Sequence, residues 1–344
     1  MTKLSLAKQL LITGFSGFEA PPTSKVASLI KQGLGGVILF DYDARQKVFE
    51  KNIRSPEQVK SLTNSLRSFA EEAKDNSYFD GKLLIMTDEE GGLVSRLKPA
   101  YGFAPSLSEQ KRGLLPDAEI FNQACVIADN LTTAGINMNA APCVDIAFSK
   151  SVIAEKERCF CENEVKTANA ACLTAKAFLS KGILPVFKHF PGHGSTLTDT
   201  HEKLADISDT FEKRELFPYV AGLQNNVMPA VMVGHLWHRK IDAVYPASLS
   251  FEAQTRLLRQ KIGFQGVIIS DDIQMKALRN SYSLEEIVVR FFEAGGDILL
   301  LGNNLMNEEG REKEIFHLIT QHFSTERIEE SLQRIKKMKE KIQN

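Results

Sequence analysis

The 344-residue sequence has no long apolar run, no low-complexity linker and no large excess of charge of either sign. None of its apolar segments reaches the roughly 18 consecutive residues that identify a membrane-spanning helix. Its 42 Lys and Arg residues nearly balance its 43 Asp and Glu residues, which gives a formal net charge of -1. This balance provides no general attraction to nucleic acid or to an anionic membrane. We therefore expect neither partner, and the composition suits a neutral small molecule.

Cysteine is also scarce, with 5 residues spread over the chain. They lack the dense, even-numbered pattern of a small disulfide-stabilised secreted domain. At the N-terminus, Lys8 and Gln9 interrupt the apolar residues, and the segment lacks a small-residue cleavage site. These features predict a cytoplasmic protein with reduced thiols.

Short apolar segments, typical of buried strands, alternate with longer amphipathic segments, typical of helices. The predicted strands are residues 10–13, 36–40, 83–86, 136–140, 184–187, 230–233, 267–269 and 298–301. The predicted helices are residues 24–32, 56–73, 118–134, 164–180, 211–224, 251–260, 284–294 and 307–323, and a last charged helix, 326–341, is expected to cover the surface.

This alternation is compatible with a (β/α)8 barrel or with an open doubly wound sheet. No Gly-rich dinucleotide fingerprint follows the first strand, and five strands end in ionisable residues. In a barrel these strand ends would converge on one pocket at the C-terminal face. The sequence therefore predicts an α/β protein, a single-domain TIM-type (β/α)8 barrel formed by residues 1–344.

Residues 183–201, ILPVFKHFPGHGSTLTDTH, combine a strand with a polar loop. Asp199 lies two residues before His201, and a carboxylate at this spacing can fix the tautomer of the imidazole, which makes a candidate proton carrier. His189, His193 and His201 could instead be zinc ligands, although the glycines and proline exclude the helix that would align them. A solvated turn with chance histidines is a further alternative.

The KHFPGHG motif followed by D-T-H resembles the signature of family 3 glycoside hydrolases, in the β-N-acetylglucosaminidase branch. The resemblance covers residues from about 6 to about 302. It implies that Asp199 and His201 form the general acid/base pair and that Lys188 and His189 bind substrate. Ser195 stands where relatives often have Asp, so its role is left open.

A second block, DEEGGLVSRL, resembles the family's D-x-E-G-G-x-V-x-R-L segment, whose Asp and Arg bind the hydroxyls of the non-reducing sugar. It implies this role for Asp88 and Arg96, a carboxylate acceptor and a five-donor guanidinium. Without the resemblance, a solvated turn would explain the block. Leu93 replaces a common Arg and is expected to lie outside the sugar pocket. Arg158, in a segment resembling R-x-F, is a further candidate contact.

The segment GVIISDD ends the seventh predicted strand with two carboxylates. Because strand side chains alternate, we expect only one of them to face the barrel mouth. The resemblance assigns the nucleophile to Asp271, and Asp272 is expected to cap the following segment. Among other polar strand-end residues, Asp145 is expected to tie a loop, whereas His235 and Trp237 are left open between packing and sugar contact.

The resemblance implies retaining hydrolysis of terminal non-reducing β-linked N-acetylglucosamine from glycosides such as cell-wall muropeptides or chitin fragments. Asp271 would attack the sugar, while His201, held by Asp199, would protonate the leaving oxygen and then deprotonate water. A neutral histidine base would not repel phosphate, so phosphorolysis stays open. We expect a small carbohydrate substrate, no cofactor and no metal.

Three alternative functions are kept. A β-glucosidase of the same family is the nearest, although such relatives usually carry their acid/base on a second domain. The others are a metal-dependent hydrolase built on the loop histidines and a sugar-binding barrel without turnover. The sequence leaves the oligomeric state open.

Overall fold

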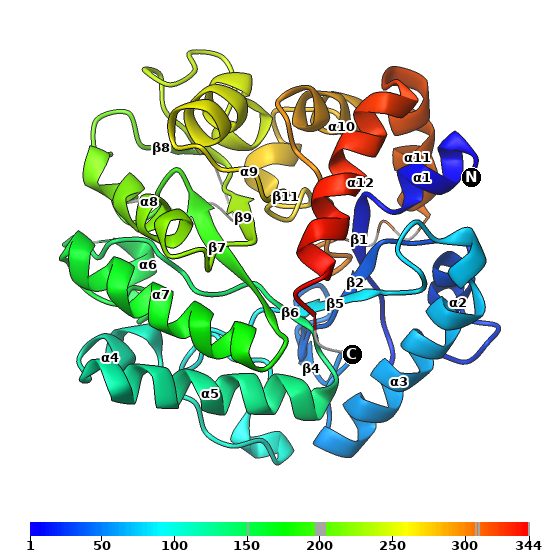
Figure 1. The fold of residues 1–344 in the computed structure, drawn as a ribbon, viewed down its shortest axis with the longest axis horizontal. Helices are drawn as coiled ribbons and strands as arrows, with labels where there is room; N and C mark the ends of the chain where they lie inside the picture. Colours follow the sequence, from blue (N-terminus) through cyan, green and yellow to red (C-terminus); the bar gives the residue numbers. More distant parts are fainter. Residues whose placement is uncertain (150, 197–203, 307, 309, 343–344) are drawn as a thin grey trace.

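Eight parallel strands form a barrel in the computed structural model, which describes residues 1–149, 151–196, 204–306, 308 and 310–342 (Figure 1). The neighbouring strands follow the order β12, β1, β2, β5, β6, β7, β9 and β11. A parallel bridge between Ile269 and Ile298 joins the two ends of this order. The strands are β1 (Leu11–Gly14), β2 (Gly36–Ile38), β5 (Leu84–Thr87), β6 (Met138–Asn139), β7 (Leu184–Phe190), β9 (Ala230–Val233), β11 (Val267–Ser270) and β12 (Leu299–Leu301).

All eight predicted strands and the predicted (β/α)8 architecture are confirmed. Their residues are buried, as expected for parallel strands with the barrel interior on one face and helices on the other. β7 extends to Phe190, beyond the predicted end at residue 187, and its pairing with β9 shifts register between Phe187 and Phe190. The strand therefore includes the polar residues Lys188 and His189.

The helices surround the barrel (Figure 1). The principal ones are α1 (Lys3–Lys8), α2 (Lys25–Lys31), α3 (Pro56–Glu72), α5 (Asp117–Ala134), α7 (Glu164–Ser180), α8 (Phe217–Gln224), the π-helix η5 (Glu252–Lys261), α10 (Leu284–Glu293), α11 (Arg311–His322) and α12 (Thr325–Lys339). Side chains of Ser24, Ser55, Asn163 and Ser283 accept hydrogen bonds from the first turns of α2, α3, α7 and α10. Such N-caps explain why these helices begin close to their predicted positions. Within the described part of the chain, every helix is too short or too polar to cross a bilayer.

Two predicted helices differ in extent from the observed ones. Residues 211–224 form a 3-10 turn, η3 (Lys213–Leu216), before α8, whose first turn contains Pro218. α11 begins at Arg311 and not near residue 307, because Gly310 precedes it with a left-handed φ of 111°.

Asp297, which is fully buried and precedes β12, links the barrel strands to the surrounding helices. Its carboxylate accepts hydrogen bonds from Arg259 of η5 at 2.6 Å and from Arg334 of α12 at 3.0 Å. It also accepts one from the backbone N of Ile268 in β11 at 2.9 Å. These bonds fix α12 against the strands, as expected for a last helix that covers the barrel surface.

Candidate active site

A cavity of about 350 Å³ lies at the C-terminal ends of the barrel strands. Seven strands or the segments that follow them contribute residues to its wall, with Arg158 in the segment after β6. These include Phe40 after β2, Asp88, Glu90 and Arg96 after β5, Lys188 and His189 in β7, Met232 in β9, Asp271 and Asp272 after β11, and Asn304 after β12. Barrel closure thus brings together residues that the sequence separates widely.

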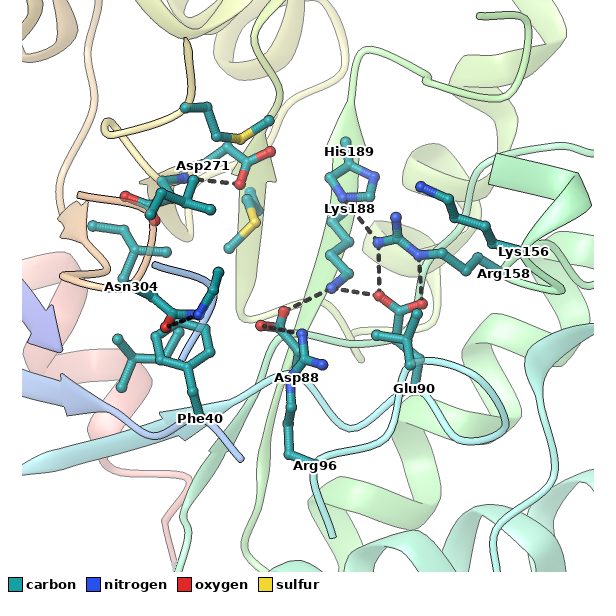
Figure 2. A pocket seen from close by; sticks show the side chains of 18 of the residues that line it. Phe40, Asp88, Glu90, Arg96, Lys156, Arg158, Lys188, His189, Asp271 and Asn304 are labelled. Atoms are coloured by element: carbon teal, nitrogen blue, oxygen red, sulfur yellow. Dashed lines mark hydrogen bonds and ion pairs between the residues drawn. The ribbon is translucent and has the colours of Figure 1, made fainter. Parts of the chain in front are cut away.

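Lys188 and Glu90 form the charged centre of the cavity wall (Figure 2). The Lys188 ammonium lies 2.6 Å from Glu90 Oε1 and 3.0 Å from Asp88 Oδ1. Arg158 donates to both Glu90 oxygens at 2.8 Å. Burial opposes ionisation of Glu90, but Arg158 and Lys188 together hold its pKa well below the usual range. The result is a fixed array of donors and acceptors suited to a hydroxylated ligand.

Glu90 is a cavity residue that the sequence motifs did not identify as a ligand-binding group. Glu90 lies beyond the end of β5 at Thr87, where strand alternation gives no signal for the direction of a side chain. The preceding Glu89 is fully buried and accepts hydrogen bonds from the backbone N of Arg96 and Leu97 at 2.7 and 2.8 Å. These hydrogen bonds stabilise the turn after β5 that places Arg96 at the cavity wall.

Arg96 lies between two carboxylates. Its Nη2 is 3.8 Å from Asp88 Oδ2, and its Nη1 is 3.7 Å from Oδ1 of the fully buried Asp41. By contrast, Leu93 is 68% exposed and is not among the cavity residues, as expected for a change outside the sugar pocket.

His189 is oriented by Asp145, which follows β6. The Nδ1 of His189 lies 2.7 Å from Asp145 Oδ2, and its Nε2 lies 3.4 Å from Arg158 Nη2. Asp145 Oδ1 also accepts from the backbone N of His193 at 2.7 Å. Asp145 therefore has a structural role, but the segment that it ties is 189–193 and not the loop that it opens, and it directs one edge of His189 into the cavity.

Asp271 and Asp272 are both residues of the cavity wall, although alternation within a strand would place only one of them there. β11 ends at Ser270, and strand alternation does not constrain residues beyond that end. Asp272 Oδ1 accepts from the backbone N of Gln274 and of Gly302, each at 3.0 Å. Asp272 thus caps the turn, as predicted, and also binds the end of β12. Burial raises its pKa to about 6.

The glycine-containing loop after β7 packs closely against the barrel. A Cβ added to Gly194 would lie 1.9 Å from the carbonyl oxygen of Ile146, so only glycine fits there. His193 lines the cavity, and its Nδ1 lies 2.5 Å from Thr196 Oγ1. Burial and the neighbouring His189 lower the pKa of His193 to about 4. The predicted acid/base residues Asp199 and His201 lie outside the described residues.

Two further residues left open by the sequence lie away from the described cavity wall. His235 is buried and bonds to Ser248 Oγ at 2.8 Å and to the carbonyl oxygen of Asp272 at 3.0 Å. These bonds support the turn that follows β11. Trp237 belongs to β10 (Leu236–Trp237), which pairs with β8 (Ala205–Asp206), and it is not among the cavity residues.

Among the described residues, one group has the composition of a metal site: Cys143 Sγ, Asp145 Oδ2 and His189 Nδ1 all lie within 4.8 Å of one another. These atoms already bond to each other, with Cys143 3.1 Å and His189 2.7 Å from Asp145 Oδ2. Burial raises the pKa of the Cys143 thiol well above its ordinary value, which disfavours the thiolate that a metal requires. The group fits a hydrogen-bond network better than a metal centre.

A (β/α)8 barrel with a charged cavity at the C-terminal ends of its strands has the architecture of a TIM-barrel enzyme. A family model described as "Glycosyl hydrolase family 3 N terminal domain" matches residues 6–338. The chain therefore belongs to glycoside hydrolase family 3, and the family resemblance of its motifs is confirmed.

Individual relatives agree with this membership. A "Beta-hexosaminidase" of Xylella fastidiosa (strain M23) is 32% identical, with 85% of this chain and 83% of the relative aligned. "Beta-hexosaminidase A" of Pseudoalteromonas piscicida is 28% identical over 94% of this chain, which spans 55% of that relative's length. A solved glycoside hydrolase family 3 β-N-acetylglucosaminidase from Paenibacillus sp. str. FPU-7 has a TM-score of 0.87 and 29% identity, covering 99% of this chain and 62% of that one. These relatives support a glycoside hydrolase of the β-hexosaminidase type.

Proposed function

We propose that residues 1–344 form one catalytic barrel domain that hydrolyses terminal, non-reducing β-linked N-acetylglucosamine with retention of configuration. The observation that carries the proposal is that Asp271 lines the same cavity as the charged array of Asp88, Glu90, Lys188 and Arg158. One strand end thus offers a carboxylate nucleophile, and the opposite wall offers hydroxyl-binding groups. The names of the Xylella and Paenibacillus relatives favour an N-acetylhexosamine over glucose.

The cavity has the size and polarity of a small-molecule site. Its volume of about 350 Å³ lies near the lower end of the roughly 300–1,000 Å³ typical of ligand pockets. Apolar side chains such as Phe40 and Met232 line it together with the charged groups. Asp88 would accept hydrogen bonds from the sugar hydroxyls, whereas Arg96, Arg158, Lys188 and His189 would donate them.

In the proposed mechanism, Asp271 attacks the anomeric carbon and forms a covalent glycosyl-enzyme. Asp271 Oδ1 accepts a hydrogen bond from the backbone N of Asp272 at 2.8 Å, which orients the carboxylate. His201 donates a proton to the leaving oxygen and later takes one from the attacking water, while Asp199 holds its ring and stabilises the imidazolium. The motif spacing and the family resemblance support the roles of this pair.

The natural substrates in this proposal are glycosides of cell-wall muropeptides or of chitin fragments, met in the cytoplasm. A β-glucosidase is the main alternative, because Asp88 and Arg96 would serve any pyranose with free hydroxyls. Phosphorolysis, in which the glycosyl group is transferred to phosphate in place of water, would use the same glycosyl-enzyme. Each alternative is separated by the products formed from defined glycosides.

The test compares kcat/KM for p-nitrophenyl β-glycosides of N-acetylglucosamine, glucose and xylose. We expect the N-acetylglucosaminide to be preferred and the first sugar product to retain the β configuration by NMR. The Asp271→Asn protein, prepared in the same way, controls for contaminating hydrolases. Preference for the glucoside would favour the β-glucosidase alternative. Binding of N-acetylglucosamine without turnover of any glycoside would favour a sugar-binding barrel without catalytic activity. Zinc analysis of the purified protein tests the metal-dependent hydrolase.

A further inference from the structure

A short hairpin after β2 stands beside the cavity and has no part in the proposed mechanism. Its strands are β3 (Tyr42–Asp43) and β4 (Val48–Phe49), paired antiparallel with Tyr42 opposite Phe49. Tyr42 contributes to the cavity wall, whereas Val48 is 49% and Phe49 59% exposed. Val48 and Phe49 thus form a small exposed apolar surface next to the cavity.

The surroundings of Phe49 place it at the cavity rim. The centroid of its ring lies 5.0 Å from that of Tyr42, with the rings tilted by 55°. On another side, Lys98 Nζ lies 4.5 Å from the ring centroid. That ammonium is 2.5 Å from Asp41 Oδ2, and the other oxygen of Asp41 is 3.7 Å from the cavity residue Arg96. Phe49 is therefore flanked by Tyr42, a residue of the cavity wall, and by Lys98, which is linked to the wall residue Arg96 through Asp41.

The hairpin is held in place by the loop after β12. The backbone N of Ala44 donates to Asn304 Oδ1 at 3.2 Å, and Lys51 Nζ donates to the same oxygen at 3.1 Å. Asn304 lines the cavity on the side of Asp271 (Figure 2). Within the hairpin, Asp43 Oδ1 accepts from two successive backbone N–H groups, those of Arg45 and Gln46. A surface fixed in this way binds a ligand without a large ordering cost.

The chemistry of this surface suits the apolar face of a sugar ring. Aromatic side chains offer large, rigid area, and the Tyr42 hydroxyl and the Lys98 ammonium add polar groups beside it. The cavity takes the sugar whose anomeric carbon meets Asp271, so the leaving group must emerge at the rim. We infer that Tyr42 and Phe49 form a leaving-group subsite that stacks on the second sugar ring of an oligosaccharide. This inference rests on the proposed function.

The experiment compares N,N′-diacetylchitobiose with methyl β-N-acetylglucosaminide, whose leaving group is also a poor one but has no ring to stack. The measured quantity is the ratio of kcat/KM for the disaccharide to kcat/KM for the methyl glycoside. Phe49→Ala should lower this ratio about five- to tenfold, the range expected for loss of one aromatic contact. Phe49→Tyr, which keeps the ring, should preserve the ratio and shows whether position 49 tolerates substitution.

Phe251→Ala is the matched control, because Phe251 is also exposed, at 44%, and lies outside the described cavity wall. Its ratio should stay within about twofold of the wild type. An equal fall for both substrates in Phe49→Ala would show that the hairpin only supports the cavity, and an unchanged ratio would show that the ring contacts no leaving group. Either result overturns the inference while the wild type remains an active N-acetylglucosaminidase. Failure of the wild type on both substrates would instead overturn the proposed function.

Discussion

Lys188 Nζ lies 3.0 Å from Oδ1 of Asp88, although 100 positions separate the two residues in the chain. The same ammonium reaches Glu90 at 2.6 Å. Burial disfavours the charged amine, but Glu90 and Asp88 raise the pKa of Lys188 above its ordinary value. The cavity wall therefore carries a permanent cation between two carboxylates, opposite the proposed nucleophile Asp271 (Figure 2).

Replacing Asp271 by Ala or Asn should abolish the covalent step while N-acetylglucosamine still binds. The reason is that Asp271 lines the cavity, whereas Asp272 caps a turn through Gln274 and Gly302. Single-turnover kinetics and ligand titration separate the two effects. Near-normal kcat in Asp271→Ala, together with loss of turnover in Asp272→Ala, would reverse the assignment of the nucleophile.

Replacing Asp88 or Arg96 by Ala should lower kcat/KM for the N-acetylglucosaminide at least tenfold, the equivalent of about 1.4 kcal/mol of transition-state binding. Each substitution removes a group of the cavity wall that is proposed to bind a sugar hydroxyl. Leu93→Ala, in the same turn but 68% exposed, is the control and should retain activity. Unchanged kcat/KM in both Asp88→Ala and Arg96→Ala would show that residues 88–96 form a surface turn without a role in substrate binding.

Glu90→Gln should destabilise the fold by about 3–5 kcal/mol, because it leaves the buried charges of Lys188 and Arg158 without their shared carboxylate. Urea denaturation measures the change in the free energy of unfolding. Glu71→Gln is the control, since its ion pair with Lys74 is exposed and should contribute less than about 1 kcal/mol. Equal stability of the two variants would contradict a structural role for the Glu90 pairs.

His201→Ala should impair glycosides with sugar or alkyl leaving groups far more than activated aryl glycosides, because poor leaving groups depend most on protonation. Azide, which needs no deprotonation, should accelerate the variant on an activated substrate and yield a β-glycosyl azide from the Asp271 intermediate. EDTA should leave the wild type active. Inactivation by EDTA, with activity restored by added zinc, would instead favour zinc binding by His189, His193 and His201.

Glu215 should make stability depend on pH. It packs against the loop after β7, since a Cβ on Gly192 would lie 2.7 Å from the Glu215 Cβ, and burial raises its pKa to about 7 from an ordinary 4.5. The folded state then holds the proton more tightly than the unfolded chain. Its stabilising contribution is complete below about pH 4.5 and is lost as the pH rises through about 7.

The measurement compares the free energies of unfolding of wild type and Glu215→Gln across this range. Because the variant cannot titrate, the difference between wild type and variant should fall by up to about 3 kcal/mol between about pH 4.5 and pH 8. Parallel pH profiles would show that the folded protein does not hold this proton.

The sequence by itself determined the barrel. Parallel strands buried on both faces require short apolar segments, and the helices between them require amphipathic ones, so the strand and helix order follows from composition along the chain. Polar residues directly after these strands, such as Asp88, Lys188 and Asp271, were likewise predictable as cavity residues. A TIM barrel places all its C-terminal strand ends on one face.

Only the tertiary structure decided which side chains meet on that face. The pairing of Glu90 with Lys188 and Arg158, the orientation of His189 by Asp145 and the attachment of the hairpin to Asn304 join residues 44 to 260 positions apart. Such contacts depend on barrel closure and on side-chain directions beyond the strand ends, where no periodicity applies. Asp272, beyond the end of β11, is likewise held by a distant segment, because its carboxylate accepts a hydrogen bond from the backbone N of Gly302 after β12.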